Sequence, residues 1–337
     1  MTGETEPSEH AKTDSPAQSP ETTAALRQMV ADTNESREAE PHGDWQTRII
    51  LQRHTDYDNR FPEEWSSPTA EEAQTLGRLT PEGVANSQAA TKERVEEALR
   101  EGGPDTDFLV IASPTFWVDR PEFGQRAIET GEVISDEILR QLKDAGLGEE
   151  HLLNTTDSFK SREGSDYHGK HVRPKKQLVE SQMFQDPAFA DIVREEFGGK
   201  QNREFWDKYN ADPPDRKALR EANPVDGRPA EGSPEAAERM NFVVNAAERY
   251  AEAYHRKNPG RKLVIFLVSH HEAIEPYVQR ALRVPPKVFE PDKNQGVTID
   301  VDAQGVGHTN VAGEDIDVEF TRHGRPPKLA PLDTELE

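Results

Sequence analysis

Three short apolar runs along the chain have the pattern of buried strands. They lie at residues 47–52, 108–113 and 263–268, and each holds a continuous apolar stretch bounded by polar residues. Such runs are typical of strands that are covered on both faces in a parallel sheet. Two later segments, 297–301 and 315–320, indicate strands at the sheet edge, separated by a glycine-rich turn.

Segments with helical spacing lie between these runs. A helix is expected from Thr80 to Leu99, because Thr80 can cap it, Pro81 suits its first position, and the Gly-Gly-Pro at 102–104 stops it. The clearest helical periodicity covers residues 122–145. Further helices are expected at 187–197, 204–209, 234–256 with Ser233 as N-cap, and 273–282. Strands alternating with helices predict an α/β fold, a three-layer α/β/α sandwich with a mostly parallel central sheet.

Composition limits how much of the chain folds. Only 33% of the 337 residues are hydrophobic, and the mean hydropathy is -0.89. Segments that cannot bury enough apolar surface to offset chain entropy stay disordered. We therefore expect a disordered acidic tail at 1–43, a single domain at 44–322 with a polar insertion at about 154–176, and a loose Pro-rich tail at 323–337.

The net charge of -23 argues against nonspecific binding to nucleic acid or to an acidic membrane. A phosphate site would have to be a local basic pocket. One basic cluster, from His168 to Lys176, stands out in so acidic a chain, and it reads equally as an attractor of a phosphorylated substrate or as a solvated loop. Zero cysteines exclude disulfides and thiolate sites. We expect a cytoplasmic protein, since no run approaches the roughly 20 apolar residues of a membrane helix.

Two histidines follow two of the apolar runs. His54 comes directly after the first run and Arg53, and His270 follows the third run and Ser269. Two histidines delivered by two strand ends can meet at one site. Such a pair suits phosphoryl transfer, because one neutral imidazole can attack phosphorus while the other, with nearby arginines, holds the equatorial oxygens.

A series of short motifs surrounds these histidines in a fixed order. They are Arg53-His54-Thr55 after a strand, Leu79-Thr80-x-x-Gly83, Ser113-Pro114, Arg126-Ala127-x-x-Thr130, Leu178-x-Glu180, the region 231–239, and Val268-Ser269-His270 followed by Ile274. This series resembles the histidine phosphatase superfamily, which includes cofactor-dependent phosphoglycerate mutases and related phosphatases. The literal Arg-His-Gly at 322–324 lacks a downstream helix and the rest of the series, and we interpret it as chance.

The resemblance implies a role for each of these residues. His54 would be the nucleophile that becomes phosphohistidine, and Arg53, Arg126 and His270 would clamp the phosphoryl oxygens. Glu180 would protonate the leaving oxygen. Two alternatives stay open, Arg120 in place of Arg126 and Glu272 in place of Glu180, because extra residues separate Ser113-Pro114 from Arg126 and because Glu272 follows the second histidine closely.

The chain departs from the family pattern beside both histidines. Thr55 replaces the usual glycine, and His271 stands where the mutase branch carries glycine. Together with Asn59 and Arg60, near where the family places a phosphate-contacting asparagine, these residues are expected to contact the substrate. We expect no metal, since adjacent histidines on an extended segment point opposite ways, and no cofactor.

The resulting hypothesis is metal-independent hydrolysis of phosphomonoesters through phospho-His54. The alternatives are a phosphoglycerate mutase-like phosphomutase and a non-catalytic scaffold that binds phospho-ligands. The expected partner is a small phosphorylated substrate or a phosphoprotein, with no nucleic acid and no membrane. The resemblance also leaves a homodimer open.

Overall fold

The computed structural model describes residues 45–58, 77–114, 125–153, 172–178, 195–196, 203–212, 217–218, 221–222, 231–286 and 288–329. Several expectations therefore lie outside the described residues. They are both proposed tails apart from 323–329, almost all of the insertion and of the helix at 187–197, and the site candidates Asn59, Arg60, Arg120 and Glu180.

A seven-stranded mixed sheet forms the centre of the domain, in the order β3-β2-β4-β1-β5-β6-β7. Four strands run parallel to their neighbours, namely β3 (Val172–Pro174), β2 (Thr106–Ala112), β4 (Lys262–Ser269) and β1 (Thr47–Arg53). The antiparallel strands β5 (Gly296–Val301), β6 (Val306–Val311) and β7 (Glu314–Glu319) extend the sheet from β1. The three longer parallel strands, β1, β2 and β4, are those with the continuous apolar runs, as expected for strands covered on both faces.

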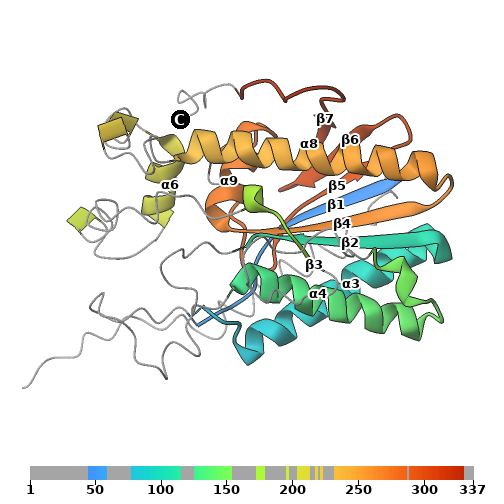
Figure 1. Ribbon diagram of the computed structural model, residues 1–337. Helices are drawn as coiled ribbons and strands as arrows, with labels where there is room; N and C mark the ends of the chain where they lie inside the picture. The colour runs from blue at the N-terminus through green and yellow to red at the C-terminus, as the bar shows by residue number, and fades with distance from the viewer. Residues whose placement is uncertain are drawn as a thin grey trace, which may run out of the picture. The chain divides into compact units, whose positions relative to one another are not determined.

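Helices cover the two faces of the parallel strands (Figure 1). On one face lie α3 (Pro81–Gly102) and α4 (Arg126–Asp144), and on the other α8 (Ser233–Lys257) and α9 (His271–Arg280). A shorter helix, α6 (Arg203–Ala211), contacts α8 and α9. Three 3-10 turns, η1 (Gly103–Asp105), η2 (Glu149–His151) and η3 (Lys176–Leu178), complete the described elements. The predicted three-layer α/β/α sandwich is confirmed.

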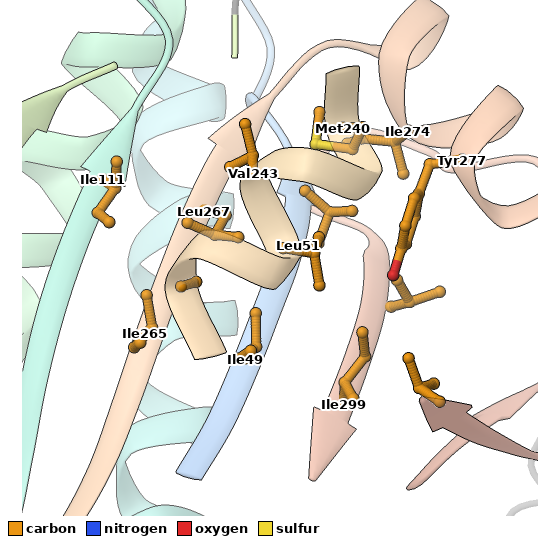
Figure 2. Packing of buried hydrophobic residues seen from close by; sticks show 14 of the residues in the cluster. Ile49, Leu51, Ile111, Met240, Val243, Ile265, Leu267, Ile274, Tyr277 and Ile299 are labelled. Carbon is orange, nitrogen blue, oxygen red and sulfur yellow. The ribbon is translucent and has the colours of Figure 1, made fainter. Parts of the chain in front are cut away.

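Alternate residues of each central strand divide between two cores. Ile49 and Leu51 of β1 pack with α8 and α9, whereas Ile50 between them packs on the side of α3 and α4. Figure 2 shows Leu51 and Leu267 beneath Met240 and Val243 of α8, with Ile274 and Tyr277 of α9 beside them. This division accounts for strands that are apolar at successive positions.

The first turn of α3 presses on the loop that follows His54. Thr80 caps the helix as predicted, with its hydroxyl oxygen accepting from the Gly83 amide at 3.0 Å. A side chain at Gly83 would collide with the Asp56 carbonyl oxygen, only 2.2 Å from an added Cβ. The glycine thus permits the close approach of the helix to the loop.

Two expectations about local structure are wrong. Gly232, not Ser233, is the N-cap of α8: the Gly232 amide donates to the Glu235 carboxylate at 3.0 Å, and the Ser233 hydroxyl instead bonds to the Asn210 carbonyl of α6 at 3.3 Å. The strand at 297–301 is not at an edge, because it pairs with β1, and the unpredicted strand β6 lies beyond it. Within the described ranges, no helix is long and apolar enough to cross a membrane.

A substitution at Gly296 tests how closely β5 approaches β1. An added Cβ there would lie 1.8 Å from the Leu51 carbonyl oxygen, so Gly296→Ala must push the two strands apart and should lower the free energy of unfolding by about 1–3 kcal/mol. Thr298→Ala, at an exposed position of the same strand, should change it by no more than about 0.5 kcal/mol. Urea unfolding of both variants measures the difference, and equal stabilities would contradict the close approach.

Candidate active site

The carboxyl ends of β1 and β4 bring the two candidate histidines together, beside the end of β2. In the β1–β4 pair Arg53 lies opposite Ser269, so that His54 and His270 follow side by side. The His54 amide donates to the Ser269 carbonyl at 3.0 Å, and the two imidazole centroids are 5.2 Å apart. Ser113 follows β2 on the other side, with its hydroxyl 2.9 Å from His270 Nε2. Both histidines are buried, at 2% and 0% exposure.

The hydrogen bonds of His54 determine which ring nitrogen is free to react. Its Nδ1 lies 2.8 Å from the Thr55 carbonyl oxygen, which can only accept, so Nδ1 carries the proton. Its Nε2 accepts from Arg126 Nε at 3.1 Å. Nε2 therefore holds a lone pair that is directed into the group of cationic side chains.

Arg126, the first residue of α4, joins the two histidines. Besides its bond to His54, its Nη2 lies 3.5 Å from His270 Nδ1, and its guanidinium stands 4.5 Å over the Tyr57 ring. Because an arginine only donates, His270 Nδ1 must accept and His270 Nε2 must carry the proton toward Ser113. Ser113 in turn donates to the Pro114 carbonyl at 3.3 Å.

Both histidines are held neutral. Burial, followed by the charges of Arg126, His270 and Arg53, lowers the pKa of His54 well below its ordinary value. Burial and the charges of Arg126, Arg239 and Arg53 lower the pKa of His270 in the same way. Desolvation disfavours a charged imidazole, and cationic neighbours disfavour it further. At neutral pH the site thus combines two neutral imidazoles with permanently cationic arginines.

Arg53, at the end of β1, keeps an unused donor. Its Nη1 donates to the Pro291 carbonyl at 3.2 Å and lies 3.5 Å from His271 Nδ1. Its Nε is buried and has no hydrogen-bond partner among the described residues. A buried donor without a partner costs free energy, which an incoming anion would recover.

Thr55 bonds to the segments around it through its hydroxyl and its amide. Its hydroxyl donates to the Gly83 carbonyl and accepts from Asn294 Nδ2, both at 2.8 Å, and its amide bonds to Thr130 at 3.2 Å. The side chain is fully buried. The hydroxyl thus holds α3 and the Asn294 loop to β1, and the substrate contact expected of Thr55 stays a prediction.

His271 is engaged in a similar way. Its Nε2 lies 2.7 Å from the Glu275 carboxylate, its Nδ1 faces Arg53, and only 3% of the residue is exposed. The structure places His271 against Arg53, and the substrate contact expected of it stays a prediction.

Three further residues contribute to the site, and the sequence analysis gave them no role. Ser113 and Tyr57 contact the histidines, the Tyr57 ring lying 5.1 Å from that of His54. Arg239 of α8 binds Glu231 through two bonds of 2.6 Å, and its charge acts on His270. Ser113 and Arg239 belong to noted motifs, whereas no sequence signal marked Tyr57.

The remaining candidates are placed only in part. Glu180 lies outside the described residues, but the carbonyl of Leu178 accepts from the Ser269 hydroxyl at 2.8 Å, directly before His270. Among the residues that the structure describes, no group of three or more His, Asp or Glu side chains is arranged to hold a metal ion.

No protein-family model matches the chain, and no curated protein matches it. Solved structures do match. A mycobacterial glucosyl-3-phosphoglycerate phosphatase matches at 16% identity and a TM-score of 0.42, over 78% of this chain and 97% of that one, and the same protein is solved with inorganic phosphate and with VO3. A phosphoglycerate mutase from Bacillus anthracis matches at 16% identity and a TM-score of 0.43, over 80% and 93%.

A phosphoserine phosphatase from Entamoeba histolytica, solved in complex with 3-phosphoglyceric acid, matches at 15% identity and a TM-score of 0.38, over 78% of this chain and 94% of that one. Matches at these identities and TM-scores carry no argument about activity, which has to come from the site. The likeness of the chain to these mutase and phosphatase structures is one of fold.

Proposed function

We propose that this chain hydrolyses phosphomonoesters through a phosphohistidine on His54, without a metal ion. The observation that carries the proposal is the unprotonated Nε2 of a buried, neutral His54, which accepts a bond from Arg126 and lies beside His270. A neutral imidazole is a good nucleophile, and the neighbouring arginines attract the phosphoryl oxygens that it attacks.

In the first step the phosphoryl group replaces the internal contacts of the arginines. Arg126 turns its donors from the imidazoles to the equatorial oxygens, and the unused Nε of Arg53 supplies another donor. His54 Nε2 then attacks phosphorus in line with the ester oxygen. The N–P bond forms as the P–O bond breaks, and the leaving alkoxide takes a proton from a general acid.

We assign the general acid to Glu180 rather than Glu272. Glu272 is buried in the first turn of α9, and its negative charge favours the charged forms of Arg53 and Arg239, although burial still lowers the pKa of Arg53. We therefore give Glu272 an electrostatic role beside the two guanidinium groups and leave the proton transfer to Glu180. Glu180 lies two residues beyond Leu178, whose carbonyl bonds to the Ser269 hydroxyl.

In the second step water attacks the phosphohistidine. The N–P bond breaks, inorganic phosphate leaves, and the carboxylate that donated its proton now accepts one from the water. Hydrolysis is preferred over mutase activity because the longer mutase signatures are not recognisable after His54. A non-catalytic scaffold is disfavoured because His54, Arg53 and Arg126 are all retained.

The substrate class that we propose is a small phosphorylated compound. The two histidines are at most 2% exposed, so a phosphate group must enter a buried site to reach them.

Replacing His54 should abolish turnover. With EDTA present, His54→Ala should lower hydrolysis of an aryl phosphate by on the order of 10³-fold or more and remove acid-labile phosphate from the protein, because no other residue takes the phosphoryl group. His323→Ala, in the exposed Arg-His-Gly at 322–324, is the matched control and should behave as wild type. Wild-type protein that neither turns over nor becomes labelled would refute the proposal and favour a phosphate-binding scaffold.

Arg126→Lys should show whether activity requires the planar guanidinium of Arg126 or only a positive charge at this position. Lysine keeps the positive charge but loses the fork that reaches His54 and His270 together, so kcat/KM should fall by about 10²–10³-fold. Arg140→Lys, at a half-exposed side chain of the same helix, should leave kcat/KM unchanged. Steady-state kinetics with vanadate inhibition compare the two, and equal activity of both variants would exclude Arg126 from the clamp.

The pKa values of His54, His270 and His308 should differ in the directions that their surroundings imply. Since the pKa of His54 and that of His270 are lowered, both rings should stay neutral as the pH falls through about 6.5, where an ordinary histidine gains its proton. His308 is an internal control whose pKa is shifted in the opposite direction. Slight burial lowers the pKa of His308, but Asp317 and Asp302 outweigh burial and raise it. NMR titration of the ring resonances measures all three, and a His54 that is protonated at pH 7 would contradict its role as nucleophile.

A further inference from the structure

A buried pair of side chains, His271 and Glu275, lies in α9 directly after His270. Their exposed fractions are 3% and 0%, and His271 Nε2 lies 2.7 Å from a Glu275 oxygen. A carboxylate only accepts, so Nε2 carries the proton and Nδ1 keeps its lone pair. That lone pair faces Arg53 Nη1 over a long contact of 3.5 Å, and Arg53 only donates.

Glu275 is ionised and has two further donors. Burial acts to raise its pKa, but the bonds from His271 and Arg203 outweigh burial, and the pKa is lowered. Its second oxygen, Oε1, accepts from Arg203 Nη2 at 2.7 Å and from Gln279 Nε2 at 3.0 Å. One carboxylate oxygen thus serves His271, and the other is held by two other donors.

Helix α6 covers this pair with one face. Arg203 bonds to Glu275, Trp206 stacks on the His271 ring with centroids 4.3 Å apart and planes 26° apart, and the Tyr209 hydroxyl donates to the Glu272 carbonyl at 3.3 Å. These positions are three residues apart, so they share a side of the helix. The cover holds the imidazole in one orientation.

We propose that His271 and Glu275 are positioning residues for Arg53. Glu275 keeps the proton of His271 on Nε2, the free Nδ1 accepts from Arg53 Nη1, and the guanidinium is thereby held with its unused Nε available to the phosphoryl group. Arg203 and Trp206 stabilise the arrangement from α6. This inference rests on the proposed phosphatase function and extends it to residues that do not touch the substrate.

Glu275→Gln should reverse the tautomer with little change in shape. Arg203 and Gln279 both donate to Oε1, so they retain the amide oxygen and turn the amide nitrogen toward His271. That nitrogen donates, which forces the His271 proton onto Nδ1 and directs it against the Arg53 donor. We expect kcat/KM to fall by about 10–100-fold and inorganic phosphate to bind several-fold more weakly, as when a catalytic group is displaced.

A matched control lies on α4. Glu137 is 4% exposed and accepts from Arg140 and, four residues on, from Gln141, as Glu275 does from Arg203 and Gln279. Glu137→Gln should keep both kcat/KM and phosphate affinity. It reports what the loss of a buried carboxylate does by itself.

A second variant separates positioning from folding. His271→Asn retains a carbonyl oxygen near the place of Nδ1, which accepts from Arg53 whatever residue 275 is. The double variant Glu275→Gln/His271→Asn should therefore be more active than Glu275→Gln alone, a non-additivity that damage to the fold does not produce. Nitrogen NMR of the His271 ring should show the proton on Nε2 in the wild type and on Nδ1 in Glu275→Gln.

The outcomes distinguish this inference from the proposed function. Wild-type protein without turnover defeats the phosphatase proposal, and phosphate affinity and the ring tautomer still test the positioning role. Unchanged kcat/KM and phosphate affinity in Glu275→Gln would overturn the inference, as would a double variant that is as impaired as Glu275→Gln. An unchanged His271 tautomer would overturn it as well.

Discussion

In the parallel pair formed by β1 and β4, Arg53 lies opposite Ser269, and the next residue of each strand is a histidine. A slip of one residue in this pairing would turn every side chain of one strand to the opposite face and separate the two imidazoles. The register is held by the two cores, because Ile49 and Leu51 must face α8 and α9 while Ile50 faces α3 and α4. Packing far from the site thus sets the geometry at the strand ends.

Three arginines lie around the two histidines, although the net charge of the chain is strongly negative. Arg53 comes from the end of β1, Arg126 from the start of α4, and Arg239 from the first half of α8, and all three act on the pKa of His270. Burial first, and then the charges of Arg126 and Arg53, keep both imidazoles neutral, with Arg239 acting on His270 as well, so the site combines neutral imidazole nitrogens with cationic donors. An anion that enters such a site finds its partners already oriented, which is the condition for electrostatic stabilisation of a transition state.

The sequence was sufficient for the elements whose pattern is local. The strand before His54, the helix capped by Thr80 and the strand before His270 all follow from apolar spacing and capping chemistry. β6 was missed because its buried positions include Gly307 and Thr309, so no apolar alternation marks it. Ser233 was predicted as the cap because serine is a common N-cap residue. In the structure the cap is Gly232, and the side chain of Glu235, three residues further on, accepts a hydrogen bond from the Gly232 amide.

Contacts in the site were harder to predict because they depend on which groups, distant in the sequence, lie next to a side chain in the folded structure. The motifs located Thr55 and His271 beside the histidines, but only the three-dimensional structure reveals that the Thr55 hydroxyl is taken by Gly83 and Asn294. The spacing of His271 and Glu275 is that of neighbours on a helix, yet the helix was expected to begin at residue 273, which hid the pair.

The junction between β4 and α9 directs two adjacent imidazoles to two different arginines. His270, the last extended residue, contacts Ser113 and Arg126, whereas His271, the first residue of the helix, turns toward Arg53 and α6. The change from strand to helix at this point is what lets neighbouring residues serve separate groups. A glycine at position 271, as in the mutase-like pattern, would leave Arg53 without this acceptor and Trp206 without the ring it covers. His271 therefore links Arg53 to α6, a connection that glycine does not provide.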